Sequence, residues 1–86
     1  MQRRRRKILY ANKVIELMGA FPGRDFRMVA IVRYVSDGKQ FDLKGRRALR
    51  KALLRVLDTL EESGSVLVRP PRASRGGYAL YQWRKQ

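Results

Sequence analysis

The side chains of this sequence that could do chemistry are mainly cations, and they are gathered in three blocks. Residues 1–7 carry a net charge of +5, residues 43–56 carry +6 and residues 65–86 carry +5, whereas residues 57–64 carry −3. Guanidinium and ammonium groups at this density bind polyanions, because each neutralised phosphate releases condensed counterions. The chemistry that these blocks offer is recognition of negative charge.

The whole chain has the same bias. It contains 21 Lys and Arg against 7 Asp and Glu, a net charge of +14 over 86 residues. Repulsion among these positive charges lowers the stability of the folded state, and a polyanionic partner would reduce that repulsion. Nucleic acid is the default partner and an anionic membrane surface is the rival. No apolar run approaches the length of a membrane span, so we expect no membrane partner.

The sequence lacks two residue types that enzymes commonly use for catalysis. There is no histidine and no cysteine, which removes the commonest general base, the commonest thiol nucleophile and the favoured zinc ligands. No glycine-rich loop of the kind that cradles phosphates is present. We therefore expect a protein that is not an enzyme and that needs no cofactor or metal.

Hydrophobic periodicity predicts one α+β domain, because 86 residues are too few to build two cores. Apolar residues at helical spacing predict helices over residues 8–18, 28–36 and 44–63. After Gly64 the pattern becomes extended, and two strands enclose the turn-forming segment 70–77. The predicted fold is three helices followed by a two-stranded antiparallel β-hairpin, with a short extended piece at residues 25–27. Residues 1–7 are expected to form a disordered basic arm ahead of the domain at 8–86.

Aromatic residues near the ends of these elements are expected to pack inside. Phe21 follows the first helix and is expected to fill the core, and Tyr81 and Trp83 alternate on one face of the last strand. For the latter two, core or hairpin packing is favoured over base stacking.

The charges of the third helix are arranged against its dipole. Asp42 is a suitable N-terminal cap and Gly64 a suitable terminator, yet the first half of the helix is basic and the second half contains Asp58, Glu61 and Glu62. Each misplaced terminal charge costs about 0.3–1 kcal/mol at low salt. The arrangement is reasonable if an anion is brought to the basic end, where helix N–H groups and arginines act on the same phosphates. The alternative is that these residues only form a charged face of the helix that is exposed to solvent.

The order and size of these elements resemble those of winged helix-turn-helix domains. By this resemblance "KGRRALRKALLR" (residues 44–55) is the start of a recognition helix, and "RPPRASRGG" (residues 69–77) is the tip of a wing. The resemblance implies a sequence-specific double-stranded DNA-binding protein with helix 44–63 in the major groove and the wing beside it. The small size suggests a transcriptional regulator of the kind found on phages or plasmids, cytoplasmic and nucleoid-associated when bound to DNA.

Three groups of residues are the candidates for DNA contact. On the helix, a ridge opposite the leucine stripe is expected, with Arg46, Arg47 and Arg50 in the groove and Lys44, Lys51 and Arg55 at phosphates. On the wing, the candidates are Arg69, Arg72, Ser74 and Arg75, of which Arg72 and Arg75 are expected at the adjacent minor groove or backbone. On the basic arm, the candidates are Arg3, Arg4, Arg5, Arg6 and Lys7.

Two other binding classes stay open. An RNA-binding or ribosome-associated winged-helix module would use the same basic surfaces. A protein-interaction module would dock a partner through the acidic patch of Asp58, Glu61 and Glu62. A homodimer is also open, with the first helix as the expected contact surface.

Overall fold

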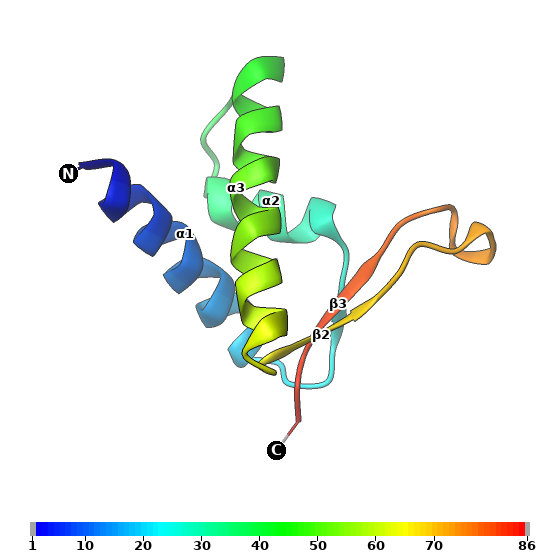
Figure 1. The fold of residues 1–86 in the computed structure, drawn as a ribbon. Helices are drawn as coiled ribbons and strands as arrows, with labels where there is room; N and C mark the ends of the chain where they lie inside the picture. The colour runs from blue at the N-terminus through cyan, green and yellow to red at the C-terminus, as the bar shows by residue number, and fades with distance from the viewer. Residues whose placement is uncertain (1, 86) are drawn as a thin grey trace.

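Helices and short strands alternate along the chain in an α+β arrangement. The computed structural model describes the backbone of residues 2–85 and the side chains of residues 10–74 and 76–85. The described elements are α1 (Gln2–Gly19), β1 (Asp25–Phe26), α2 (Met28–Ser36), α3 (Leu43–Glu62), β2 (Val66–Arg69), the 3₁₀ turn η1 (Ala73–Arg75) and β3 (Leu80–Trp83). In Figure 1, α3 stands in front of α2, with α1 on one side and the β2–β3 hairpin on the other.

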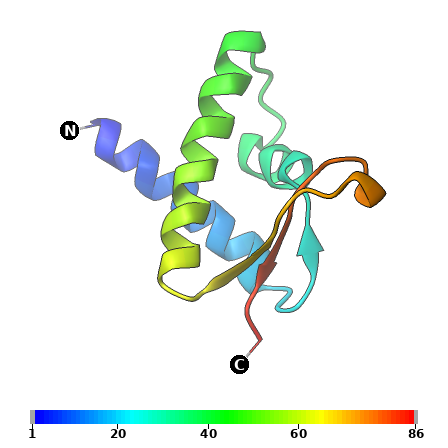
Figure 2. The same ribbon diagram turned by 45° about the vertical axis from the view of Figure 1, so that its right-hand side comes forward.

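The first helix begins earlier than its sequence pattern predicts. Its first residue is Gln2 instead of Ile8, so the backbone of residues 2–7, expected as a separate disordered arm, continues the helix. Arginine and lysine are good helix formers, which permits this extension. Figures 1 and 2 show α1 close to α3 at its C-terminal end and diverging from it toward the N-terminus.

The sheet has three strands where the sequence predicted a two-stranded hairpin. The strand order is β1-β3-β2, and both neighbours run antiparallel to β3. Phe26 pairs with Tyr81 and Asp25 with Gln82, so the extended piece expected at residues 25–27 is a sheet strand. The segment before it is fixed by two contacts with β3: the Gly23 amide donates to the Trp83 carbonyl at 2.8 Å, and Gln82 Nε2 donates to the Gly23 carbonyl at 2.6 Å. These contacts join residues far apart in sequence, and local pattern cannot reveal them.

Left-handed residues end α2 and α3 at the predicted places. Asp37 has φ 51° after α2, and its amide donates to the Arg33 carbonyl. Gly64 has φ +84° after α3, where the Gly64 and Ser65 amides bond to the Glu61 and Leu60 carbonyls at 3.0 and 2.9 Å. Glycine adopts this conformation at little steric cost, which makes it a common helix terminator.

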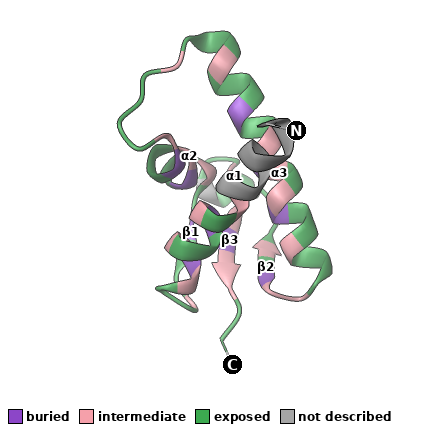
Figure 3. Cartoon of the chain, turned by 90° about the vertical axis from the view of Figure 1, so that its left-hand side faces the viewer, coloured by how far each residue is buried: buried purple, intermediate pink, exposed green. Residues whose placement is uncertain are grey.

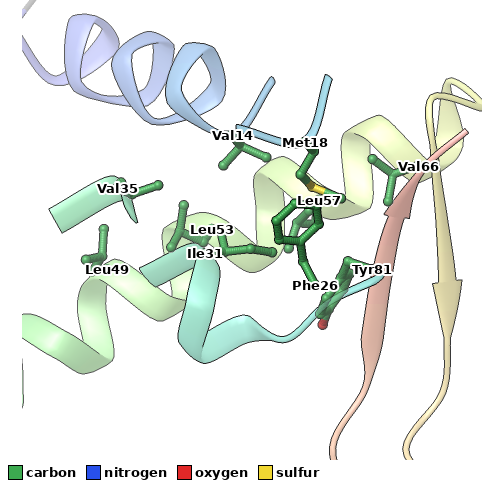
Figure 4. Packing of buried hydrophobic residues seen from close by; sticks show 10 residues of the cluster. All are labelled: Val14, Met18, Phe26, Ile31, Val35, Leu49, Leu53, Leu57, Val66 and Tyr81. Atoms are coloured by element: carbon green, nitrogen blue, oxygen red, sulfur yellow. The ribbon is translucent and has the colours of Figure 1, made fainter. Parts of the chain in front are cut away.

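A single hydrophobic core lies where the helices meet the sheet. Every described element except η1 contributes to it, as Figure 3 shows by burial and Figure 4 by side-chain packing. Its buried members are Val14, Met18, Phe26, Ile31, Val35, Leu49, Leu53, Leu57, Val66 and Tyr81. Leu49, Leu53 and Leu57 all come from the stripe predicted on α3, so the core fixes which side of α3 faces outward.

Packing confirms the role predicted for the strand aromatics and corrects the expectation for Phe21. Tyr81 is buried and Trp83 packs against the core. Phe21, expected in the core, is 46% exposed; the Arg24 guanidinium lies 5.2 Å from its ring centroid, over a surface aromatic. On α2 the buried residues are Ile31 and Val35, whereas Val29 is exposed because it lies two residues before Ile31, on the opposite face of the helix.

Candidate nucleic-acid interface

The cap at Asp42 positions the basic start of α3. Asp42 is extended, and its carboxylate accepts a 2.7 Å hydrogen bond from the Gly45 amide. The Arg46 amide donates to the Asp42 carbonyl at 2.9 Å, and Arg46 Nε donates to the Phe41 carbonyl at 3.2 Å. A short polar side chain at this position satisfies an N–H group that the helix leaves free. The first turn of α3 is therefore well ordered, and Arg46 is partly engaged in it.

Gly45 has a structural reason to be glycine. A Cβ placed there would lie 3.0 Å from Asp42 Oδ1 and 3.2 Å from Phe41 Cδ1. Both contacts are tighter than ordinary van der Waals separations, so a larger residue would disturb the cap. Glycine has a poor helix propensity, but a larger residue would not fit here because Phe41 and Asp42 lie against Gly45.

The basic residues of α3 do not all line one hollow. Arg50 lines a hollow shared with the hairpin, whereas Lys51 and Arg55 line a groove between α3 and α1 on the opposite flank. Lys44, Arg46 and Arg47 are exposed on the first turns. The predicted contacts are therefore divided between two flanks of the helix, with Arg50 nearest the hairpin.

A hollow between α3 and the hairpin is lined by two arginines, Arg27 and Arg50. It has a volume of about 480 Å³ and is bounded by the start of α2, by Arg50 of α3 and by both arms of the hairpin. Arg27, the residue before α2, lies with its guanidinium carbon 4.0 Å from the Tyr78 ring centroid. Stacking on an aromatic face holds a guanidinium in place while leaving its edge N–H groups free. Two arginines, one of them pre-oriented, thus line a single concave surface.

These two arginines have no carboxylate partner within the side chains that the structure describes. The ion pairs found there join Lys13 to Asp37 and Arg69 to Asp25, each at 3.6 Å. Neither Arg27 nor Arg50 takes part in them. A concave surface with two uncompensated cations is a suitable binding place for an anion.

The charge of Arg50 affects the pKa of Tyr81, which also lines the hollow. Burial raises the pKa of Tyr81 above its ordinary value of 10.0, and the positive charge of Arg50 acts in the opposite direction. Arg50 therefore lies close enough to influence the tyrosine without cancelling the effect of burial.

The hairpin presents part of the predicted wing set. Arg72 and Ser74 are exposed at its tip, which projects away from the helices in Figure 1. The tip is closed by hydrogen bonds from the Gly76 and Gly77 amides to the Ala73 and Arg72 carbonyls, at 3.0 and 2.9 Å. Arg69 is paired with Asp25 across the sheet, so its charge is partly compensated. The side chain of Arg75 lies outside the described residues.

The side chains of the basic arm, Arg3, Arg4, Arg5, Arg6 and Lys7, also lie outside the described residues. Their backbone belongs to α1, which runs on the side of α3 opposite the hairpin in Figure 1. They stay candidates on sequence grounds alone.

Sequence reasoning missed Arg27 and Tyr78 as site residues. Arg27 was taken for part of an extended connection, and Tyr78 for a strand residue. The prolines at 70 and 71 end the first strand, and they line the same hollow as Arg27 and Tyr78. The pairing itself depends on β1, which brings the start of α2 beside the hairpin.

Three further searches, two of the described residues and one of known proteins, found nothing. Among the described residues, no group of three or more Asp, Glu, His or Cys side chains could hold a metal ion. No helix in that part of the chain is long and apolar enough to cross a membrane. No protein-family model matches the chain, and neither a curated protein nor a solved structure matches it.

Proposed function

We propose that this chain is a winged helix-turn-helix protein that binds double-stranded DNA with sequence preference and acts as a small transcriptional regulator. The support from the fold is the order of the elements and the placement of the hairpin beside α3. The support from charge is the net +14 of the chain and the +6 carried by residues 43–56. A helix and a hairpin on one side of a basic domain can contact neighbouring grooves of a duplex.

The observation that carries the proposal is the hollow lined by Arg27 and Arg50. Both arginines lack a carboxylate partner among the described side chains, and both face a surface bounded by α3 and the hairpin. A backbone phosphate placed there would receive charge-assisted hydrogen bonds from two sides. Phosphate contacts of this kind fix the register of a protein on the duplex.

The remaining basic residues are assigned by their exposure and by their positions on α3 and the hairpin. Arg47 is exposed on the N-terminal part of α3, where recognition-helix residues reach base edges, and we assign it a base contact. The sequence pattern placed Arg50 with the base-reading residues; its position in the hollow favours a phosphate contact instead. Arg72 at the hairpin tip is assigned to the neighbouring minor groove or backbone.

Selection from random pools is the direct test. Random duplex DNA and random structured RNA would compete for the protein at one salt concentration, and the retained sequences would be determined. We expect the duplex pool to be retained and to converge on a short motif. Stronger retention of the RNA pool would favour an RNA-binding function, and duplex retention without a motif would leave non-specific binding.

Variants then separate base reading from phosphate binding. Arg47→Ala should relax the preference at one or two positions of the motif, with about 1–3 kcal/mol of discrimination lost per base pair. Arg33→Ala is the matched control, because Arg33 is an exposed arginine on α2 that does not line the hollow. Equal losses for Arg47→Ala on motif and non-motif duplexes would contradict the assignment of a base contact.

A further inference from the structure

The acidic second half of α3 is not explained by DNA binding. Asp58, Glu61 and Glu62 lie toward the negative end of the helix dipole, where they are unfavourable, and carboxylates close to a duplex repel its phosphates. Asp58 and Glu62 take part in no ion pair within the described side chains, and the same holds for Lys51 and Arg55. These four charges are therefore available to a partner.

Four of these charges occupy one face of α3. Residues 51, 55, 58 and 62 are spaced by four, three and four positions, the spacing that places side chains in one row along a helix. Leu49, Leu53 and Leu57 occupy the opposite face and are buried, so this row, which we call the charged seam, points away from the core. All four of its residues are exposed, and no other element lies in front of α3 in Figure 1.

The charged seam is self-complementary when two copies of α3 run antiparallel. In that arrangement the register that brings Arg55 opposite Asp58 of the second copy also brings Lys51 opposite Glu62 of the second copy. One register serves both pairs because residues 55 and 58 have the same midpoint in the chain as residues 51 and 62, between Val56 and Leu57. The two-fold axis repeats each pair. We propose that the chain forms a homodimer through the charged seam, with the two α3 helices antiparallel.

An apolar groove beside the seam supplies area that the second copy would cover. The groove lies between α1 and α3, has a volume of about 570 Å³ and is lined by Tyr10, Ala11, Ala48, Lys51, Ala52, Arg55, Val56, Thr59 and Leu60. Lys51 and Arg55 belong to both the groove and the seam, so a helix placed on the seam borders the groove along its length. Charges of both signs in mirrored order select a second copy as the occupant, because a uniformly acidic partner would meet Asp58 and Glu62.

The net charge of +14 does not prevent this pairing. At physiological ionic strength, charges separated by more than about 8 Å are largely screened, whereas the seam pairs would lie in contact. Their opposite signs therefore act at short range, while the repulsion between distant basic blocks is reduced.

The dimer would also arrange the proposed DNA contacts, a consequence that rests on the proposed function. Arg47 lies in the same row four residues before Lys51, outside the paired residues 51–62, so the second α3 does not cover it, and a two-fold axis perpendicular to both helices places one Arg47 at each end of the pair. Arg47 lies between nine and ten residues from the midpoint, and at 1.5 Å per residue the two Arg47 positions are separated by roughly 30 Å along the helices. Half-sites one helical turn apart are about 34–36 Å apart. We therefore expect a palindromic motif with half-sites about one turn apart.

Charge reversal across the seam tests the dimer without any DNA. Arg55→Glu and Asp58→Arg would each be examined by sedimentation velocity over a concentration series. Each should raise the dimer dissociation constant by about tenfold or more, because one reversal makes two symmetry-related pairs repulsive. A one-to-one mixture of the two variants should restore the dimer. In the mixed dimer the glutamate introduced at position 55 of one chain meets the arginine introduced at position 58 of the other, and the native Asp58 and Arg55 meet in the same way.

The controls make each outcome decisive. Arg33→Glu changes the net charge as much as Arg55→Glu but lies on α2, and it should leave the dissociation constant unchanged. Thermal unfolding of each variant checks that it is folded, which we expect because both seam positions are exposed. A wild-type chain that stays monomeric throughout the series overturns the proposal, as does a dimer indifferent to both reversals. Loss of duplex binding with an intact dimer would instead contradict the DNA-binding function.

Discussion

Replacing Arg50 with alanine removes one of the two cations that line the hollow between α3 and the hairpin. Arg50 is exposed and has no carboxylate partner within the described side chains, so its loss should leave the fold intact. The substitution should make the free energy of DNA binding less favourable and reduce its dependence on salt. It should affect all duplexes alike, because a phosphate contact carries no sequence information.

The magnitude follows from counterion release. Losing one phosphate contact reduces the slope of log K against log salt by about 0.9. Between about 50 and 200 mM salt, a fourfold change, the affinity ratio of wild type to variant should therefore shrink by about 3.5-fold. Because Arg27 and Arg50 line the same hollow, they would share one phosphate. The double variant Arg27→Ala/Arg50→Ala should then lose about 0.9 of slope in total, the value of one phosphate, and Arg50→Ala alone should lose at most that amount.

Fluorescence anisotropy with one labelled duplex, repeated over a salt series, measures both quantities. Arg50→Lys is the matched control: it keeps the charge and most of the slope but loses the bidentate hydrogen bonds of the guanidinium. Arg33→Ala should change neither the affinity nor the slope. If the double variant leaves the slope unchanged, or if it loses about twice the 0.9 expected for one phosphate, the phosphate-binding hollow is refuted.

Three further outcomes follow from the described contacts. Arg72→Ala should weaken binding to every duplex and flatten its salt dependence without changing the selected motif; a changed motif would show that the hairpin tip reads sequence. Asp42→Ala should lower the free energy of unfolding by about 1 kcal/mol, because it removes the 2.7 Å hydrogen bond to the Gly45 amide. That loss lowers Tm by roughly 4–8 °C for a domain of this size, whereas Asp42→Asn should retain most of the stability, and equal Tm values for both variants would contradict the capping role. Burial raises the pKa of Tyr81 in the folded state above 10.0, so the folded state holds the phenol proton more tightly and stability falls as the pH rises above 10.0. Tyr81→Phe should reduce this alkaline loss in urea unfolding at several pH values, and an unchanged pH dependence would assign it to other groups.

Local pattern was enough to predict most helices and both ends of α3. The leucine stripe of α3 follows helical spacing, and Asp42 and Gly64 are residues that begin and end helices for local reasons. The start of α1 was predicted wrongly because a run of arginines has helix propensity but no apolar periodicity. Phe21 was misplaced for a related reason: an aromatic side chain suggests burial, but here it lies at the surface against Arg24.

The candidate site was less predictable than the fold. A helical repeat places Lys51 and Arg55 on the far flank of α3 from the hairpin, so treating all basic residues of the segment as one ridge overlooked their division. Arg27 could not be found from local pattern, because its partner Tyr78 is distant in sequence. The charged seam, by contrast, depends only on spacing and charge and is readable from the sequence once the buried face of α3 is known.

Composition and short-range periodicity were sufficient to establish the sign of the charge and the segments that carry it, the absence of cysteine and histidine chemistry, and the order of helices ending in a hairpin. Contacts between distant segments were needed to bring β1 into the sheet and to place Arg27 and Arg50 at one hollow. The same contacts divided the basic residues of α3 between two flanks. The physical reason is that burial of Phe26 and Tyr81 against the helices fixes the positions of their charged neighbours, and no local pattern encodes that packing.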